Sequence, residues 1–298
     1  MLRIFAAALA VLSTAAVSCA DVRLPSVFSD HMVLQRGCPV RVWGWTNAGE
    51  TVRCELDIQS ASATAGTDGR WSVDLDAMPA GGPHELRVTG SSDPVVVSDV
   101  YVGEVWLCAG QSNMVWPVSR AKDAEREQAS AEYPQIRMFH VRSGHAEEPQ
   151  DDCEGSWSVC SPDTVGRFSA TGYFFGRWLH SKLKVPVGLL NSSVGGTPIE
   201  SWTSLSAQQD SFALTPVLNK WQQQAAAFRQ EEADAAYAAA MQKWRQRAEA
   251  ARTAGRKPPR RPRRATPVQK SNGYPSALFN GKIHPLVGYS LRGAIWYQ

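Results

Sequence analysis

The first part of the chain alternates hydrophobic and polar residues over short distances. Residues 21–98 contain such runs, separated by turn residues: VRVWGW, TVRCELDI, WSVDLDA, ELRVTG and PVVVSDV. Alternation with a period of two is typical of half-buried strands. Thr67, Asp68 and Gly69 form a hairpin signal, and Ala-Gly-Gly-Pro at residues 80–83 marks another loop. We therefore predict a small antiparallel β-sandwich over residues 21–98.

From Val100 onward, predicted strands are separated by longer helical segments, which indicates a mainly parallel sheet with helices on both faces. Residues 168–183 have the spacing of a helix that buries one face. Its apolar side chains are Tyr173, Phe174, Trp178 and Leu179. The chain then enters an apolar strand at residues 185–190, and a strand, helix, strand unit is right-handed almost without exception. Residues 99–298 are predicted to form an α/β domain.

One segment of this domain, residues 216–270, has the composition of an insert. Residues 217–254 contain no Gly or Pro and predict one long helix with a narrow apolar stripe. The stripe consists of Tyr237, Met241, Trp244 and Ala248. We expect these side chains to form packing surface; a partner-binding surface is the alternative.

The insert continues with GRKPPRRPRR at residues 255–264, which places six positive charges among prolines. Without these six charges the formal net charge of the chain would be −3 rather than +3. Nucleic-acid binding is one interpretation of such a run. Against it, no aromatic residues lie among the charges, and the chain begins with an export signal. We therefore expect a solvated loop and no nucleic-acid partner.

The first residues have the composition of an export signal. Arg3 is followed by an apolar stretch over residues 4–12 and by small residues before Asp21. The sequence therefore predicts a cleaved signal peptide at residues 1–20 and a secreted or periplasmic protein. Acylation of Cys19, which would make a lipoprotein, is the alternative. No later stretch is long and apolar enough to predict a membrane span.

Six cysteines suit an exported protein, because disulfides persist in oxidising compartments. Cys153 and Cys160 flank a short segment that we expect to be a loop, and we predict a disulfide between them. Cys38 and Cys54 are a second candidate pair, on two neighbouring predicted strands. Cys108, on an apolar strand, is predicted to be a buried thiol. No Cys or His spacing suggests a metal site.

Three tryptophans of the β-rich part, Trp43, Trp45 and Trp71, allow two interpretations. Their rings could stack on a pyranose ring, which would make this part a sugar-binding module. Alternatively, they could fill the core of the sandwich. We expect the core position.

The pentapeptide GQSNM at residues 110–114 follows an apolar run and precedes a helical segment. Gly110 lacks a Cβ, so the chain can turn sharply there and present Ser112 clear of the sheet edge. The amide of Ser112 would then point at an oxygen that becomes negative when a carbonyl is attacked. Gln111 and Asn113 could brace the loop or hold a substrate hydroxyl. Ser112 is the candidate nucleophile; a turn followed by a serine helix cap is the alternative.

A second glycine-containing loop follows the predicted strand at residues 185–190. It lies in LLNSSVGGTPIESW, residues 189–202. In open α/β sheets, ligands bind beyond the carboxyl ends of the strands. Gly195 and Gly196 would let backbone amides approach a substrate oxygen there. A turn with no chemical role is the alternative.

Three blocks in this order, GQSNM, residues 168–202 and residues 279–298, resemble the sialate O-acetylesterase group of the SGNH hydrolases. The resemblance implies a serine esterase that removes O-acetyl groups from sialic acid or related sugars. It also implies a flavodoxin-like three-layer α/β/α domain without cofactor or metal. Ser112 would be the nucleophile and first oxyanion-hole donor, and the Gly195 and Gly196 loop the second donor.

The sequence departs from this family pattern near its end. In the family, a Gly-Glu-Ser-Asn block with the third oxyanion donor and an Asp-x-x-His block with the base follow Trp-Tyr-Gln, where this sequence ends at Gln298. His284 is the one histidine inside a family motif, and we expect a structural or pocket-lining role for it. We therefore expect the N-terminal portion of a longer enzyme, with an incomplete hydrolase domain that lacks the catalytic His and Asp and is inactive alone. The alternatives are an acetylxylan esterase and a non-catalytic carbohydrate-binding protein.

Overall fold

The computed structural model describes residues 21–298, so the predicted signal peptide and the Cys19 acylation site lie outside the described residues. Its strands are β1 (Val33–Gln35), β2 (Val40–Trp45), β3 (Thr51–Leu56), β4 (Gln59–Thr64), β5 (Arg70–Leu75), β6 (Gly81–Thr89), β7 (Val95–Gly110), β8 (Tyr133–Val141), β9 (Gly155–Cys160), β10 (Val187–Ser193) and β11 (Gly293–Tyr297). Its α-helices are α1 (Ser112–Val115), α2 (Ala124–Ala129), α3 (Ala170–Leu183), α4 (Leu205–Gln209), α5 (Thr215–Ala227) and α6 (Gln230–Thr253). Short 3-10 or π-helical turns are η1 (Val118–Arg120), η2 (Val165–Arg167), η3 (Ile199–Trp202), η4 (Phe212–Leu214), η5 (Val268–Lys270), η6 (Phe279–Ile283) and η7 (His284–Leu286).

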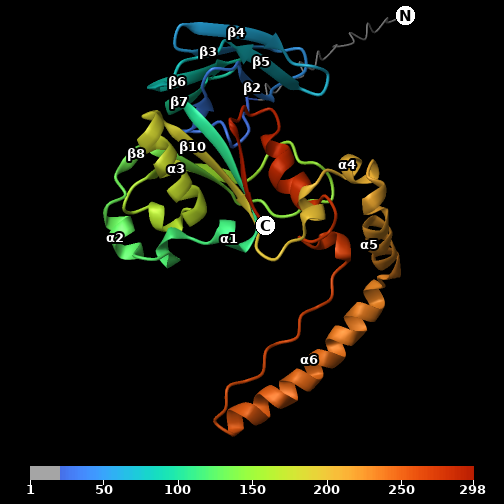
Figure 1. The fold of residues 1–298 in the computed structure, drawn as a ribbon. Helices are drawn as coiled ribbons and strands as arrows, with labels where there is room; N and C mark the ends of the chain where they lie inside the picture. Colours follow the sequence, from blue (N-terminus) through green and yellow to red (C-terminus); the bar gives the residue numbers. More distant parts are fainter. Residues whose placement is uncertain (1–20) are drawn as a thin grey trace, which may run out of the picture.

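The alternating segments form two packed sheets at one end of the molecule (Figure 1). Strands β2 and β5 pair antiparallel, and β4, β3, β6 and the first half of β7 form the second sheet. Every second residue of β2, β3 and β5 is buried, and these side chains share one core. The antiparallel sheets that the alternation predicts are therefore present.

Strand β7 belongs to both parts of the molecule. Its first half pairs antiparallel with β6, and its second half pairs parallel with β10 as far as Gly110 opposite Ser193. The boundary that the sequence predicts between residues 98 and 99 lies inside this strand. One hydrophobic core also runs through both parts and includes Phe28 and Tyr289, whose ring centroids are 5.5 Å apart. The two parts are thus joined by a continuous strand and a shared core.

The α/β part is built on the strand order β11-β7-β10-β8-β9, in which neighbours are parallel except for β8 and β9. Helices α3 and α1 pack on one face of this sheet, and η7 with Phe28 covers the other. Gly176 lets α3 approach closely, because a Cβ there would lie 2.8 Å from the Leu189 side chain. The mixed α/β fold agrees with the prediction.

One residue of α3 is placed differently from the prediction. Tyr173 is fully buried, whereas Trp178 is 58% exposed. Five residues correspond to about 140° around a helix. Trp178 therefore lies away from the face that Gly172, Tyr173 and Gly176 turn toward the sheet. The prediction that Trp178 is buried is wrong.

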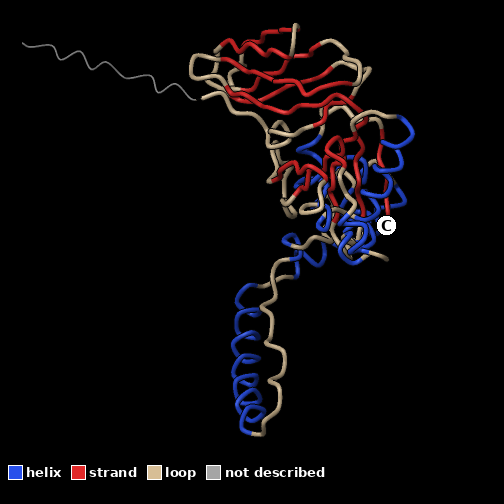
Figure 2. Tube along the Cα trace, turned by 90° about the vertical axis from the view of Figure 1, so that its left-hand side faces the viewer, coloured by secondary structure: helices blue, strands red, loops and turns tan. Residues whose placement is uncertain are grey.

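The single long helix predicted for the insert is also wrong. The structure has two helices, α5 and α6, with Phe228 and Arg229 in extended conformation between them. No Gly or Pro marks this break. Helix α6 and the returning chain form a hairpin that projects from the body (Figures 1 and 2). We call residues 230–267 the arm.

The apolar stripe of α6 packs within the arm. Met241 and Ala248 are buried, and Trp244 Nε1 donates a hydrogen bond to the Pro259 carbonyl at 2.8 Å. The packing surface predicted for the stripe is thus supplied by the return segment. The basic residues of 255–264 are exposed, as the solvated-loop prediction requires. Neither α6 nor any other helix within residues 21–298 combines the length and apolar character that a membrane crossing requires.

The structure contradicts the predicted disulfide between Cys153 and Cys160, since both are free thiols. The residues between them form β9 rather than a loop, and extended chain of this length separates its ends by about 20 Å. A disulfide needs Cα atoms within about 7 Å of each other. Cys38 and Cys54 are also free, because β3 pairs with β4 and β6 and not with β2. Cys108 is buried as predicted, and burial raises the pKa of its thiol to about 12.

Candidate active site

The central strand β7 ends in a tight bend at Gly110. This residue has φ +129°, and a Cβ there would lie 2.2 Å from the carbonyl oxygen of Tyr297. The Gln111 amide donates to that same carbonyl at 2.9 Å, so β11 fixes the bend. Only glycine satisfies both the left-handed backbone and the close approach.

Ser112 is the first residue of the one-turn helix α1 and is exposed. The N-cap is Gln111, which makes no side-chain capping bond, so the alternative of Ser112 as a helix cap is wrong. Within residues 21–298 the Ser112 hydroxyl makes no hydrogen bond, and neither do the side chains of Gln111 and Asn113. These groups are free to meet a substrate.

The diglycine loop lies directly beside this bend. A Cβ on Gly195 would be 3.5 Å from the Ser112 Cβ and 3.8 Å from its amide nitrogen. The Val194 amide donates to the Gly110 carbonyl at 3.0 Å and holds the loop against β7. Gly196 has φ +74° and open space around it, as expected for the turn itself. The structure therefore brings together the two motifs that are about eighty residues apart in the sequence.

Several residues that sequence reasoning missed brace this loop. Trp202 Nε1 donates to Thr197 Oγ1 at 2.9 Å, and Thr197 Oγ1 donates to the Val194 carbonyl at 2.8 Å. Gln298 Nε2 donates to the Thr197 carbonyl at 2.9 Å. Thr197 and Trp202 lie in the same GGTPIESW block as the glycines, and that shared block is the signal that could have found them.

A polar chain leads from the bend across the sheet. Ser193 Oγ donates to Asn191 Oδ1 at 2.8 Å, and Asn191 Nδ2 lies 3.4 Å from His140 Nδ1. His140 borders a cavity of about 370 Å³ that also contains Arg142 and Arg167. Burial, together with the charges of Lys282 and Arg142, lowers the pKa of His140. The cavity begins two strands from β7, about 10 Å from the bend.

The other histidines have partners of their own. His31 lies 2.6 Å from Asp99 and His84 lies 2.7 Å from Asp57. His145, His180 and His284 pair with Asn272, the Val185 carbonyl and the Gln150 carbonyl. In the described chain, none of the six histidines hydrogen-bonds Ser112. His284 has the structural and pocket-lining position expected for it.

Lys282 is buried, and it forms no ion pair with a carboxylate of residues 21–298. Lys282 Nζ donates to the carbonyls of Val141 at 2.6 Å and Ser143 at 2.9 Å. Burial lowers the pKa of Lys282 to about 8. Its carbonyl also accepts a hydrogen bond from Ser192 Oγ at 3.1 Å, so Lys282 ties η6 to the end of β10. Residues 21–298 contain no group of three or more His, Cys, Asp or Glu that could hold a metal ion.

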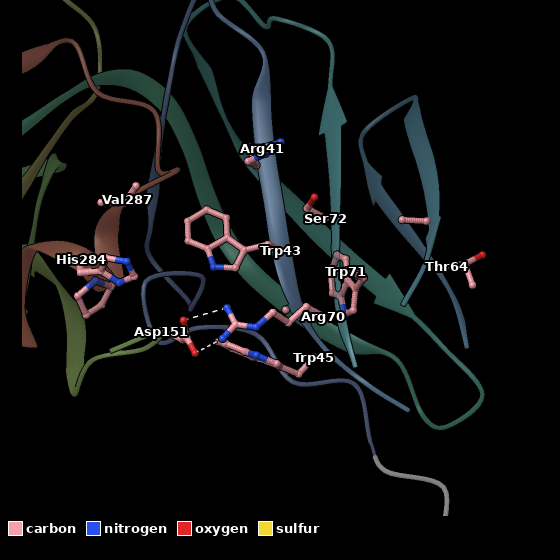
Figure 3. A pocket seen from close by; sticks show the side chains of 13 residues that line it. Arg41, Trp43, Trp45, Thr64, Arg70, Trp71, Ser72, Asp151, His284 and Val287 are labelled. Atoms are coloured by element: carbon pink, nitrogen blue, oxygen red, sulfur yellow. Dashed lines mark hydrogen bonds and ion pairs between the residues drawn. The ribbon is translucent and has the colours of Figure 1, made fainter. Parts of the chain in front are cut away.

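The three tryptophans of the β-rich part occupy different environments. Trp71 is 4% exposed and lies in the core, as expected. Trp43 and Trp45 are half-buried and line a cleft of about 510 Å³ between β2, β5 and η7 (Figure 3). The guanidinium of Arg70 lies in this cleft and forms a two-pronged ion pair with Asp151, with Nη1 to Oδ1 at 2.9 Å. The core interpretation therefore holds for Trp71. It holds in part for Trp43, which packs against the same core with its ring centroid 4.7 Å from that of Phe28 and also borders the cleft. Trp45 lines the cleft.

An α/β sheet whose central strand ends in an exposed serine, with a glycine loop beside it, has the arrangement of a serine hydrolase site. The chain belongs to the carbohydrate esterase family of sialic acid-specific acetylesterases, whose family model matches residues 102–260. The resemblance read from the sequence is thereby confirmed.

Similar proteins agree with this family. Sialate O-acetylesterase of Rattus norvegicus is 32% identical over 93% of this chain and 51% of its own length. The enzyme of the same name from Homo sapiens is 28% identical over 93% of this chain and 48% of its own length. A solved structure of a carbohydrate acetylesterase from Xanthomonas citri superimposes with a TM-score of 0.71 and 31% identity, covering 93% of this chain and 51% of that one. The chain thus spans about half the length of the relatives it matches.

Proposed function

We propose that this chain carries the nucleophile of a serine esterase that removes O-acetyl groups from sialic acid or a related acetylated sugar. The observation that carries the proposal is the exposed Ser112 at the Gly110 bend, with Gly195 beside it. The family, and the names of the relatives, support an acetylated sugar as the substrate.

In the proposed reaction, the Ser112 oxygen attacks the acetyl carbonyl carbon while a general base takes the hydroxyl proton. The amides of Ser112 and of the Gly195 and Gly196 loop stabilise the negative oxygen of the tetrahedral intermediate. Collapse of the intermediate breaks the ester bond, and the sugar oxygen receives the proton from the base. Water then attacks the acetyl-serine and releases acetate. Loss of one oxyanion donor costs about 3 kcal/mol in such reactions.

The general base is the part of this mechanism that the described residues do not supply. A base must lie within about 3 Å of the hydroxyl, and no histidine in residues 21–298 hydrogen-bonds Ser112. We infer that none of these histidines, as they are arranged here, is the base. In this proposal the side chains of Gln111 and Asn113 hold sugar hydroxyls beside the reacting ester.

The cavity beyond His140 supports a sialic acid substrate over acetylated xylan. Arg142 and Arg167 border it together with one carboxylate, Asp163, so its guanidinium groups outnumber its acid. Arg167 is exposed and makes no ion pair within residues 21–298. Sialic acid carries a carboxylate, which guanidinium groups bind well, whereas xylan units need no such partner. An acetylxylan esterase remains the alternative, and a substrate comparison separates the two.

We expect acetate release from 9-O-acetylsialic acid to exceed release from acetylated xylan, measured on the longest reading frame that contains these residues. Arg167→Gln is expected to lower kcat/KM for the sialic acid ester about tenfold, because a charge-assisted hydrogen bond is lost. The variant should leave hydrolysis of p-nitrophenyl acetate unchanged. Lys182→Gln, which removes an exposed charge elsewhere, is the matched control. Faster release from xylan would refute the sialic acid assignment.

The cleft at Trp43 and Trp45 favours a second, non-catalytic function in carbohydrate binding. The guanidinium of Arg23 lies 3.8 Å from the centroid of the Trp45 ring, and Trp45 lines the cleft. Arg70 is neutralised by Asp151, so the cleft suits an uncharged ligand with both hydroxyls and an apolar face. Trp71, whose buried Nε1 has no hydrogen-bond partner within residues 21–298, borders the same cleft.

Binding at this cleft can be tested by filling it rather than by removing a tryptophan. Ser72 is exposed and lies opposite Trp43 on β5, so Ser72→Lys should block the cleft without disturbing the core. We expect xylohexaose or N-acetyllactosamine to change the tryptophan fluorescence saturably, and Ser72→Lys to weaken binding at least about tenfold. Ser62→Lys, at an exposed position of β4, should bind normally. If neither sugar binds, or both variants bind alike, the cleft has no such function.

A further inference from the structure

The arm concentrates positive charge far from the rest of the chain. Residues 243–264 contain ten Lys and Arg and a single acidic residue, Glu249, which gives a formal charge of +9. The complete arm, residues 230–267, also contains Glu231, Glu232 and Asp234 and so carries +6 (10 − 4); since the whole chain carries +3, all residues outside the arm together carry −3. The body and the arm therefore have opposite charge, and Figure 2 shows the arm extending away from the body.

These charges have almost no partners within the protein. All ten basic side chains are exposed. Arg264 pairs with Asp234, and the other nine make no ion pair with any residue of 21–298. Like charges crowded within one Debye length, about 8 Å, repel each other. The negative charge that balances these nine side chains must come from outside the chain.

The arm is also held in shape, so its charges form a fixed surface. The Trp244 bond to the Pro259 carbonyl and the ion pair between Arg264 and Asp234 fasten the return segment to α6. Helix α6 has 24 residues, which corresponds to about 36 Å. A straight, convex rod of this length can lie along a planar surface, but it offers no concave pocket for one small ion.

The side-chain chemistry points to phosphate. Eight of the ten basic residues are arginine, and the guanidinium fork binds phosphate oxygens in pairs. The arm has no exposed large hydrophobic residue, so it would rest on headgroups without inserting into a bilayer. Its one aromatic ring in residues 243–264, Trp244, is half-buried in the hairpin and unavailable for stacking on bases. Single-stranded nucleic acid, which is bound through stacking, is therefore disfavoured.

We propose that the arm docks the protein electrostatically on the phosphate-bearing face of an anionic lipid membrane. The sequence predicts export, which puts lipid headgroups rather than nucleic acid within reach. The negative body would be repelled while the arm is attracted, so the protein would bind arm first. The end of β7 that leads into α1 points away from the β-rich part, toward the side from which the arm projects (Figure 1). Docking would thus turn Ser112 toward glycans carried on the membrane.

The test uses the purified chain and co-sedimentation with lipid vesicles. We expect binding to vesicles of phosphatidylcholine with phosphatidylglycerol, none to phosphatidylcholine alone, and loss of binding between about 0.1 M and about 0.5 M salt. The triple variant Arg260→Gln, Arg261→Gln, Arg263→Gln should bind about 100-fold more weakly. These three side chains are exposed and unpaired in the described residues, so the melting temperature should not change.

The matched control removes three charges from the body instead: Lys122→Gln, Lys182→Gln, Lys220→Gln. All three lysines are exposed, and this variant should bind the vesicles nearly as well as the parent chain. Equal binding to both kinds of vesicle would overturn the proposal, and so would an equal loss in the two triple variants. The same experiment with a short DNA duplex tests the other class of ligand. If the duplex binds more tightly than the anionic vesicles at the same salt concentration, the ligand of the arm is nucleic acid and the membrane proposal is overturned.

Discussion

Replacing Ser112 with alanine should remove acetyl-ester hydrolysis almost completely. The expected loss in kcat is on the order of a million-fold, as for removal of the nucleophile in other serine hydrolases. The reason is chemical, because alanine has no oxygen to form the acetyl-enzyme, while the fold is untouched: the Ser112 side chain is exposed and makes no hydrogen bond in the described residues. The measurement is acetate release from 9-O-acetylsialic acid by the longest reading frame that contains these residues.

Ser119→Ala is the matched control, because Ser119 is an exposed serine a few residues further along the chain. It should retain full activity. Residues 1–298 alone should show no hydrolysis that depends on Ser112, since none of the histidines in residues 21–298 hydrogen-bonds Ser112. Substantial activity of Ser112→Ala would refute the nucleophile assignment. Ser112-dependent turnover by residues 1–298 alone would refute the inference about the base.

The sequence predicted the main architecture because its patterns reflect burial directly. Period-two alternation in β2, β3 and β5 became alternating burial in the structure. The break between α5 and α6 was not predictable, because Phe228 and Arg229 have no strong preference against helix. The buried stripe of α6 was predictable, but its partner was not, since spacing along a helix says nothing about which segment covers it.

The candidate site was predictable where chain topology determines it. Residues that follow neighbouring parallel strands must meet at one sheet edge, which is why Ser112 and Gly195 lie side by side. The bracing bonds of Thr197 depend on the conformation of a loop, which a motif does not encode. The disulfide prediction failed because it treated Cys153 and Cys160 as the ends of a loop, when the segment between them is strand β9.

Gly110→Ala tests the bend itself and should be the most damaging single-methyl substitution at the site. The added Cβ would lie 2.2 Å from the Tyr297 carbonyl oxygen and 2.7 Å from its carbon, both of which are backbone atoms that cannot rotate away. The φ of +129° adds strain for any residue with a Cβ. We expect the free energy of unfolding to fall by about 3 kcal/mol, measured by urea denaturation.

The matched control for Gly110→Ala is Gly196→Ala, in the adjoining loop. Gly196 also has a positive φ, +74°, but no atom lies within 4 Å of the Cβ position, so the substitution carries backbone strain without a clash. We expect Gly196→Ala to lower the free energy of unfolding by about 1 kcal/mol. The difference in unfolding free energy between the two variants measures the contribution of the contact between the bend and β11. That contact also positions Ser112. The fraction of the Gly110→Ala variant that still folds should therefore hydrolyse the acetyl ester about 100-fold more slowly. Equal losses of stability in the two variants would contradict a bend that β11 holds in place.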